Sequence, residues 1–316
     1  MIIRLGYVAN ALRLADCTPS GAVTYKTVSK IPDFADRVGL ITRVARSNLQ
    51  NTLRILKANF FDGIQVYRFT SKLIPLATHP DFLSWDYQTD LSPELKEVGD
   101  FTKQSGMRVS LHPDHFTLLN SPDPGICAAS VRDLHYHVNI LETMGLDSKA
   151  KLVIHVGGKY GDRSKALERF KTQYALLPPG ITERLTLEND DRCFTASEVL
   201  RLAQTISIPM VFDLHHHQIL NRGESCAALL PEIFATWGAQ TPKIHVSSPK
   251  DAKNPRHHGD YIVAGPVIRL IEAAKTLRRD FDIMVEAKQK DLALFKLATD
   301  LRQAGYCLPG PGKIHL

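Results

Sequence analysis

Short apolar runs recur eight times along the chain, and each run ends in polar or charged residues. The runs cover residues 2–8, 63–69, 107–112, 151–157, 185–190, 208–217, 243–248 and 281–288. At least one segment with helix-like character separates each run from the next. Eight strands that alternate with helices predict an α/β fold of the (β/α)₈ type, the TIM barrel. No linker or low-complexity segment divides the chain, so we expect a single domain over residues 1–316.

The segments between the runs carry the start and stop signals of helices. Ser92 followed by Pro93 predicts one helix start, and Thr195 with Glu198 forms a capping box at another. Helix ends are marked by glycines that follow helical segments, at Gly63, Gly106, Gly145 and Gly305. The expected helices are residues 49–61, 92–106, 131–144, 199–206, 272–279 and 292–302.

The run over residues 208–217 (IPMVFDLHHH) changes character within its length. Its first half suits a strand buried on both faces, and its second half contains Asp213, His215, His216 and His217. Barrels place their active sites at the carboxyl ends of strands, where loops vary while the strands hold their position. Taken alone, the stretch is equally compatible with a polar loop whose histidines are solvated. Polar residues at the ends of neighbouring runs favour an active site.

Metal-binding side chains lie at the ends of most of the later runs. The strongest candidates are His112, His155, Glu188, Asp213, His216, His245, His258 and Glu286. A single histidine in an apolar strand is more commonly a hydrogen-bonded core residue, but here successive strands contribute such groups. Imidazole and carboxylate without thiolate suit Zn²⁺ or Mn²⁺, and one ion usually takes only three or four protein ligands. The set therefore predicts two or three ions that share carboxylates, an arrangement that most often serves phosphodiester cleavage.

Composition adds limits on location and partners. The chain starts without the basic and long apolar regions of a signal peptide and has no apolar stretch long enough to span a membrane, so we expect a cytoplasmic protein without a membrane partner. The net charge of +6 and the isoelectric point near 9.0 allow a polyanionic partner such as nucleic acid. We expect a monomer, because nothing in the sequence indicates an obligate protein partner.

At this point a family resemblance covers nearly the whole chain. The motifs LGYVAN, YRFTSKLIPLATHP, SLHPDHF, VIHVGGKYGDR, LENDD, FDLHHH, KIHVSSP and VEAKQKD occur in this order. Together they resemble UV damage endonuclease, a trinuclear metal enzyme of the same barrel superfamily as endonuclease IV. The resemblance implies nicking of double-stranded DNA immediately 5′ to cyclobutane pyrimidine dimers and 6-4 photoproducts. It also implies Mn²⁺ as the physiological ion, which the ligand types alone do not separate from Zn²⁺.

The resemblance also implies a division of the ligands among three ions. His112, His155 and Glu188 match one set. Glu188 then bridges to a second ion, whose other ligands match Asp213, His245 and Glu286. The third ion is left with His216 and His258. Strict strand alternation would place His215 on the side of Asp213, whereas the family pattern selects His216; we expect His216, because the strand should end before it.

Lys243 precedes His245 by two positions, so on a strand both side chains point to the same side, towards the metals. An ammonium group there would repel the ions. Endonuclease IV has an aspartate where this chain has Arg256, and the resembling family carries a carboxylated lysine at the position of Lys243. A carbamate would remove the repulsion and restore the missing carboxylate. The alternative is an unmodified lysine that reaches a DNA phosphate. We assign Glu188, Lys243 and Glu286 to catalysis.

DNA contacts are also implied by the resemblance. Tyr7 and Asn10 match residues that approach DNA after the first strand, although Tyr7 could equally pack at the barrel mouth. The family inserts a Gln–Tyr pair into the duplex, where this chain has His115 and Phe116, so its lesion preference is open. Possible phosphate contacts, each of which could instead be a solvated charge, are Arg68, Lys72, Lys159, Tyr160, Lys250 and Lys253.

Two other classes of function stay open on the sequence. A sugar isomerase or epimerase related to xylose isomerase shares the barrel and a His/Glu/Asp metal site. It would need fewer histidines and no basic mouth. A damage-binding module without catalysis would bind lesions and never nick them.

Overall fold

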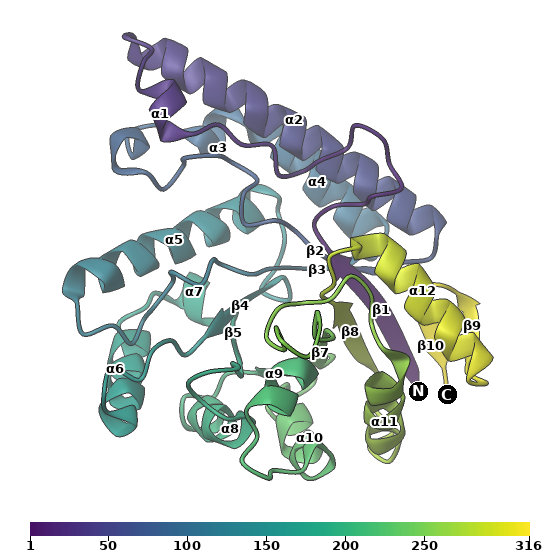
Figure 1. The fold of residues 1–316 in the computed structure, drawn as a ribbon. Coiled ribbons are helices and arrows are strands. Elements are labelled where there is room, and N and C mark those ends of the chain that lie inside the picture. Colours follow the sequence, from purple (N-terminus) through teal and green to yellow (C-terminus); the bar gives the residue numbers. More distant parts are fainter.

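Eight parallel strands close into a barrel in the computed structural model, which describes residues 1–316 (Figure 1). The strands are β1 (Ile2–Val8), β2 (Val66–Arg68), β3 (Arg108–Leu111), β4 (Lys151–His155), β5 (Leu185–Glu188), β6 (Met210–Asp213), β7 (Lys243–Val246) and β8 (Phe281–Val285). Each strand pairs with the next one in sequence, and β1 closes the barrel by pairing with both β8 and β2. The fold is therefore the expected (β/α)₈ TIM barrel.

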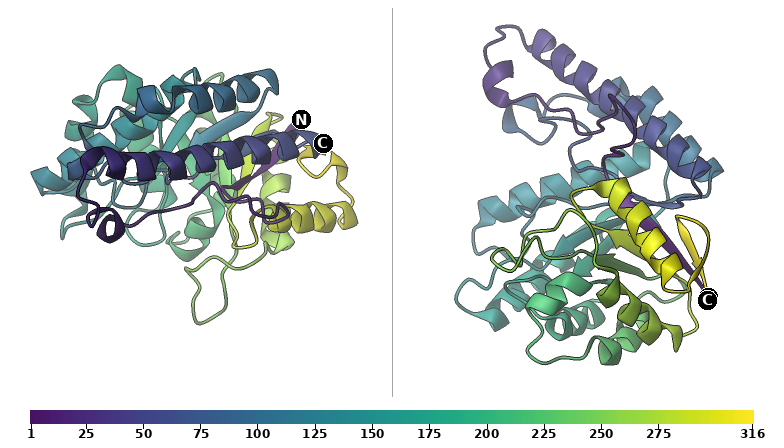
Figure 2. Two further views of the ribbon diagram at one scale, coloured as in Figure 1. Left: turned by 90° about the horizontal axis from the view of Figure 1, so that it is seen from above. Right: turned by 45° about the vertical axis from the view of Figure 1, so that its right-hand side comes forward.

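A small antiparallel addition lies beside β1. The hairpin of β9 (Cys307–Gly310) and β10 (Lys313–His315) joins the sheet through residues 2–4 of β1. Residues 6–8 of the same strand pair with β2. The two termini consequently lie next to each other (Figure 2).

Helices surround the barrel and connect its strands (Figures 1 and 2). The long ones are α2 (Phe34–Phe61), α4 (Ser92–Gln104), α5 (Pro124–Thr143), α6 (Arg163–Ala175), α8 (Ala196–Thr205), α10 (Cys226–Ala235), α11 (Ala264–Lys275) and α12 (Lys290–Gln303). Short turns of helix are α1 (Tyr25–Val28), α3 (Tyr87–Asp90), α7 (Pro179–Thr182), α9 (Leu214–Ile219) and the 3₁₀ helix Pro80–Phe82. None of the helices combines the length and the hydropathy that a membrane-spanning segment requires.

The expected strands are confirmed, and the largest difference among them concerns residues 208–217. The strand ends at Asp213, and α9 starts at the next residue. The capping box of Thr195 and Glu198 is present at α8. Gly106 adopts a left-handed φ of +64° just after α4, which explains why a glycine ends that helix.

The helix expected over residues 272–279 is confirmed only for residues 272–275, and its bounds are wrong. The structure has α11 over Ala264–Lys275, and Arg278 then takes a left-handed φ of +48° that is incompatible with helix. The sequence also failed to predict α6 and α10. Only Ala166 and Phe170 of α6 are buried, and α10 contains Pro231, so neither shows a clear apolar stripe ended by a stop signal.

The barrel interior is polar near the amino-terminal ends of its strands, on the side away from the mouth. The Arg108 Nε of β3 donates to the Asp282 Oδ2 of β8 at 2.6 Å, and the Lys243 Nζ of β7 donates to the Ser110 Oγ of β3 at 2.9 Å. Because β3 is a neighbour of neither β7 nor β8, both contacts cross the inside of the barrel. The apolar core lies outside this space, between strands and helices.

Candidate metal centre

The candidate ligands converge at the carboxyl ends of six neighbouring strands. His155 and Glu188 are the last residues of β4 and β5, and they are paired with each other in the sheet. Asp213 of β6 is paired in the same way with His245 of β7. His112 directly follows β3, and Glu286 directly follows β8. The register of the parallel sheet therefore brings these side chains to one level of the barrel mouth.

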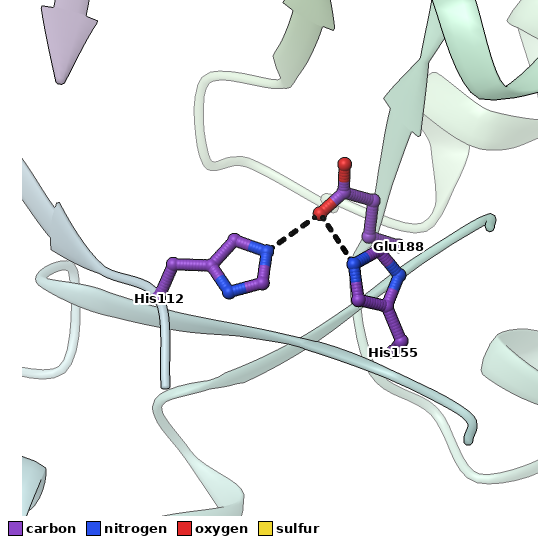
Figure 3. Close-up of side chains that lie close together, drawn as sticks. All are labelled: His112, His155 and Glu188. Carbon is purple, nitrogen blue, oxygen red and sulfur yellow. Dashed lines mark hydrogen bonds and ion pairs between the residues drawn. The ribbon is translucent and has the colours of Figure 1, made fainter. Parts of the chain in front are cut away.

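Glu188 is the centre of the cluster and is only 1% exposed. Its Oε2 atom lies 3.0 Å from His112 Nε2 and 3.8 Å from His155 Nε2 (Figure 3). Its Oε1 atom lies 3.0 Å from His245 Nδ1 and 3.6 Å from His216 Nδ1. One carboxylate is thus shared by imidazoles from four different segments.

The start of α9 decides which histidine faces Glu188. Asp213 caps this helix by accepting a hydrogen bond from the His216 backbone N–H at 2.7 Å, and the His216 Nδ1 lies 3.7 Å from the same carboxylate. His215 is buried away from the cluster, with its ring 5.9 Å from that of His258 and both nitrogens unpartnered. His217 packs against Phe212. The structure therefore brings His216, as expected, to the carboxylates.

Glu286 forms the other side of the cluster. Its Oε1 lies 3.0 Å from His245 Nδ1, and its Oε2 lies 3.9 Å from His258 Nδ1. The Arg68 guanidinium also forms an ion pair with this carboxylate. The expected contact of Arg68 with a DNA phosphate stays a prediction, but its expected placement in a loop is wrong. Arg68 is the last residue of β2, and its positive charge is already paired with Glu286.

Burial and neighbouring charges shift the pKa values of the cluster in opposite directions. Burial would raise the pKa of Glu188, but His245 and His155 hold it well below its usual range. Burial raises the pKa of Asp213 to about 7, with nearby Glu188 adding to the shift against the opposing effect of His216. Burial would lower the pKa of His216, yet Asp213 and Glu188 raise it to about 9. Three carboxylates packed this closely thus attract positive charge, in protons or metal cations.

The donor atoms fit divalent ions in three groups, within each of which they lie within 4.8 Å of one another. The groups are His112–His155–Glu188, Glu188–Asp213–His216 and Glu188–His245–Glu286. Asp213 Oδ2 is buried without a hydrogen-bond partner, which is consistent with an atom that could bind an ion. The first group matches the expected set. Asp213 joins His216 rather than His245, because both residues belong to the cap of α9, and His258 belongs to none of the three groups.

Lys243 lies in β7 two residues before His245 and is buried inside the barrel. Burial lowers the pKa of Lys243 to about 7, and the positive charges of Arg108 and Arg68 act in the same direction against Asp282. The amine donates its hydrogen bond to Ser110 and forms no ion pair with any carboxylate. A substantial fraction of this amine is therefore neutral near neutral pH.

The residues expected to contact DNA differ in their exposure to solvent. Tyr7 is 0% exposed and donates a hydrogen bond to Asn59 Oδ1 of α2 at 2.7 Å. It therefore packs between β1 and α2, as the alternative interpretation expected, and is not accessible to DNA. Asn10 and Lys159 are half-buried. Exposed side chains at or near the mouth are His115, Phe116, Lys72, Tyr160, Lys250 and Lys253. The His115 and Phe116 rings lie 4.0 Å apart, and Phe116 is 69% exposed.

A cleft of about 490 Å³ opens beside the cluster. His155 and His216 line its inner wall, and His115 and Arg192 line its outer part. The cleft connects two candidate ligands, His155 and His216, to the exposed ring of His115 at the mouth.

One functional residue was not singled out from the sequence. Asn189 donates from Nδ2 to the Asp213 carbonyl at 3.0 Å and accepts the Asp213 N–H at 2.9 Å, so it fixes the end of β6 against β5. Its own carbonyl accepts from His216 Nδ1 at 2.8 Å. An amide next to a buried strand end was the available signal, because a buried amide must find hydrogen-bond partners.

Fold and site together define a TIM barrel with a candidate centre for divalent ions at its mouth. The family model described as "UV-endonuclease UvdE" matches residues 3–307, and the chain belongs to this family.

Curated relatives and solved structures agree with this assignment. UV DNA damage endonucleases of Bacillus cereus (strain G9842) and Bacillus pumilus (strain SAFR-032) are 41% and 43% identical, over 95% of this chain and 95% and 94% of theirs. The crystal structure of SacUVDE superposes with a TM-score of 0.85 at 31% identity, over 96% of this chain and 99% of that one. Endonuclease IV from Thermus thermophilus shares the fold, with a TM-score of 0.58 at 14% identity over 95% of this chain and 99% of that one.

Because Glu188 belongs to all three groups of donor atoms, we expect its substitution to change the metal content. Glu188→Gln should lose at least one tightly bound divalent ion per chain, because a neutral amide cannot balance two cations. Metal analysis after gel filtration measures this loss. Glu183→Gln, an exposed residue just before the same strand, is the control and should keep the wild-type content. Equal metal content in the two variants would remove Glu188 from the centre.

Proposed function

We propose that this chain nicks double-stranded DNA immediately 5′ to ultraviolet photolesions, both cyclobutane pyrimidine dimers and 6-4 photoproducts, using a multinuclear centre that takes Mn²⁺. The observation that carries the proposal is the convergence of imidazoles and carboxylates on Glu188 at the mouth of a barrel of the UvdE family. The names of the relatives support the lesion class.

The proposed ligands are the residues that converge at the mouth: His112, His155, Glu188, Asp213, His216, His245, His258 and Glu286. Glu188 belongs to all three donor groups and is proposed to bridge. Divalent ions bound here would supply nucleophilic hydroxide at neutral pH and would neutralise charge on the phosphate oxygens. Arg68 fixes the Glu286 carboxylate, and Asn189 fixes the strand end that carries Asp213.

Lys243 is proposed to carry a carbamate and to act with Glu188 and Glu286 in catalysis. Addition of CO₂ needs a neutral amine, and burial brings the pKa of Lys243 close to neutrality. The N–C bond forms as the amine loses a proton, so a cation becomes an anion that can bind a metal. The proposal also accounts for Arg256, which stands where endonuclease IV has a carboxylate and which here lies near Asp191.

Lesion recognition is proposed to use Phe116 and His115, with Asn10 contacting the DNA beside them. Both rings are exposed next to the cleft that leads to the metal ligands. An exposed flat ring can stack on or replace a base in a distorted duplex. The exposed cations Lys72, Lys250 and Lys253, together with Lys159 and Tyr160, are proposed to contact phosphates.

Nicking of plasmid DNA tests the activity. Irradiated supercoiled plasmid should be converted to the nicked form with Mn²⁺ and should stay supercoiled with EDTA or without irradiation, because the reaction needs both lesion and metal. Gel electrophoresis measures the conversion, and sequencing gels locate the cut relative to a single dimer. Glu188→Gln should nick at less than about a tenth of the wild-type rate, a barrier change above about 1.4 kcal/mol, and should keep its lesion binding. A Mn²⁺-loaded protein that leaves irradiated plasmid intact, or binds lesions without ever nicking, would refute this function.

Removal of Lys243 tests the carbamate. Lys243→Ala should lose one bound ion and most of the nicking rate, and crystals grown near neutral pH should show carbamate density on the wild-type side chain. Lys151→Ala is the matched control, because Lys151 is a buried strand lysine that donates to the Glu183 carbonyl far from the ligands. A bare amine in crystals with all ions bound, or full activity of Lys243→Ala, would contradict the proposal and leave the endonuclease assignment intact.

Truncation of Phe116 tests recognition. Phe116→Ala should reduce the preference for damaged over intact duplex by about fivefold or more, because stacking on a base contributes about 1–3 kcal/mol. Competition binding with irradiated and unirradiated duplexes measures the ratio, and metal content should not change. Phe61→Ala is the control, since this ring is 88% exposed at the opposite end of the barrel. The same ratio in both variants would argue against a role for Phe116.

A further inference from the structure

Residues 9–13, which follow β1, are held to the barrel by hydrogen bonds on two sides. On one side, the Ala9 N–H donates to the Arg68 carbonyl at 2.9 Å, and the Tyr67 hydroxyl donates to the Ala9 carbonyl. On the other side, the next residues meet the first turn of α12, which packs beside β1 (Figure 1). Asn10 lies between these two attachments.

The second attachment is made by one buried carboxylate. Asp291 is 0% exposed, and its Oδ1 accepts the Leu12 N–H at 2.7 Å. Its Oδ2 accepts the Arg13 N–H at 3.3 Å and the Arg13 Nε at 3.0 Å. Hydrogen bonds to a carboxylate are stronger than neutral ones, and burial adds to their effect. Asp291 therefore fixes both the backbone and a side chain of the segment.

Backbone strain lies on both sides of this contact. Ala9 has a φ of +60° and Lys290 has a φ of +48°, and neither is a glycine. Residues in this region persist only where the surrounding structure imposes the conformation, and they are common at functional sites. Lys290 directly precedes Asp291, and Ala9 directly precedes Asn10. One strained residue thus directly precedes the carboxylate that holds the segment, and the other directly precedes Asn10.

The fastened segment is also linked to the metal centre. Arg68, whose carbonyl accepts from Ala9, binds the Glu286 carboxylate through its guanidinium. Glu286 directly follows β8, and Asp291 lies in the first turn of α12, which is the next element in the chain. Asn10 Oδ1 is buried without a hydrogen-bond partner in the protein.

We propose that Asp291 is a positioning residue that holds the Asn10 segment in the conformation that meets damaged DNA. This inference rests on the proposed function, in which Asn10 contacts the DNA. Asp291 acts through the segment and touches neither the metal ligands nor the substrate. Its loss should therefore weaken DNA binding more than it slows the cut.

Asp291→Asn is the test variant, because the amide keeps the size of the side chain but turns N–H donors toward the donors of Arg13. Asp62→Asn is the matched control: Asp62 pairs with the same Arg13 guanidinium but holds neither backbone N–H. Hydrogen exchange should become faster at Leu12 and Arg13 in Asp291→Asn and stay slow in Asp62→Asn. Unchanged protection of these amides would overturn the proposal without any activity measurement.

Kinetics on a duplex with a single dimer then separate positioning from general destabilisation. Asp291→Asn should raise KM about tenfold, equivalent to about 1.4 kcal/mol of binding, with kcat changed by less than about twofold. In an Asn10→Ala background the same substitution should add little, because its effect passes through Asn10. Asp62→Asn should leave the KM of each parent, wild type or Asn10→Ala, unchanged.

Three results would overturn the role of Asp291. An unchanged KM, a fall in kcat alone, or independent multiplicative effects of the two substitutions would each leave Asp291 a stabilising residue only. In those cases wild-type protein still nicks irradiated DNA, so the proposed function stands. If wild-type protein does not nick, the proposed function fails, and the positioning role fails with it.

Discussion

The burial of the Glu188 carboxylate is the constraint on which the rest of the site depends. A charge taken out of water needs close partners of opposite sign, and here His112, His245 and His216 surround it from three directions. Asp213 and Glu286 add negative charge to the same space, so the imidazoles alone cannot balance the cluster unless they are protonated. Divalent cations could satisfy this electrostatic demand at neutral pH, and one Asp213 oxygen is buried without a hydrogen-bond partner in the protein.

Barrel geometry turns this local demand into a defined site. Parallel register sets the ends of β4 to β7 at one level, and polar contacts across the interior hold the strands below them. The same closed interior removes Lys243 from water and lowers the pKa of its amine. Strand alternation places the Lys243 side chain on the same side of β7 as that of His245. The polar contacts in that part of the barrel interior accommodate the buried amine.

Sequence periodicity was enough to predict the barrel and most of the candidate ligands, because strand position and side-chain type are local properties. It was not enough where a residue's role depends on partners far away in the chain. Tyr7 is buried because Asn59 of α2 accepts its hydroxyl, and Arg68 is paired because Glu286 lies across the barrel end. The choice of His216 over His215 depended on where a helix starts, which alternation alone could not decide.

The loop that carries His115 and Phe116 is anchored separately from the candidate metal ligands. Thr117 Oγ1 donates to Asp133 Oδ2 at 2.7 Å, and the Leu118 N–H donates to Ser130 Oγ at 2.8 Å, so α5 fixes the loop directly behind Phe116. None of these four residues contacts Glu188. Under the proposed function, substitutions at positions 115 and 116 would therefore change contacts with DNA while the charge balance of the carboxylate cluster stays the same. Because of this separation, the exposed rings of His115 and Phe116 can vary without disturbing the buried carboxylates.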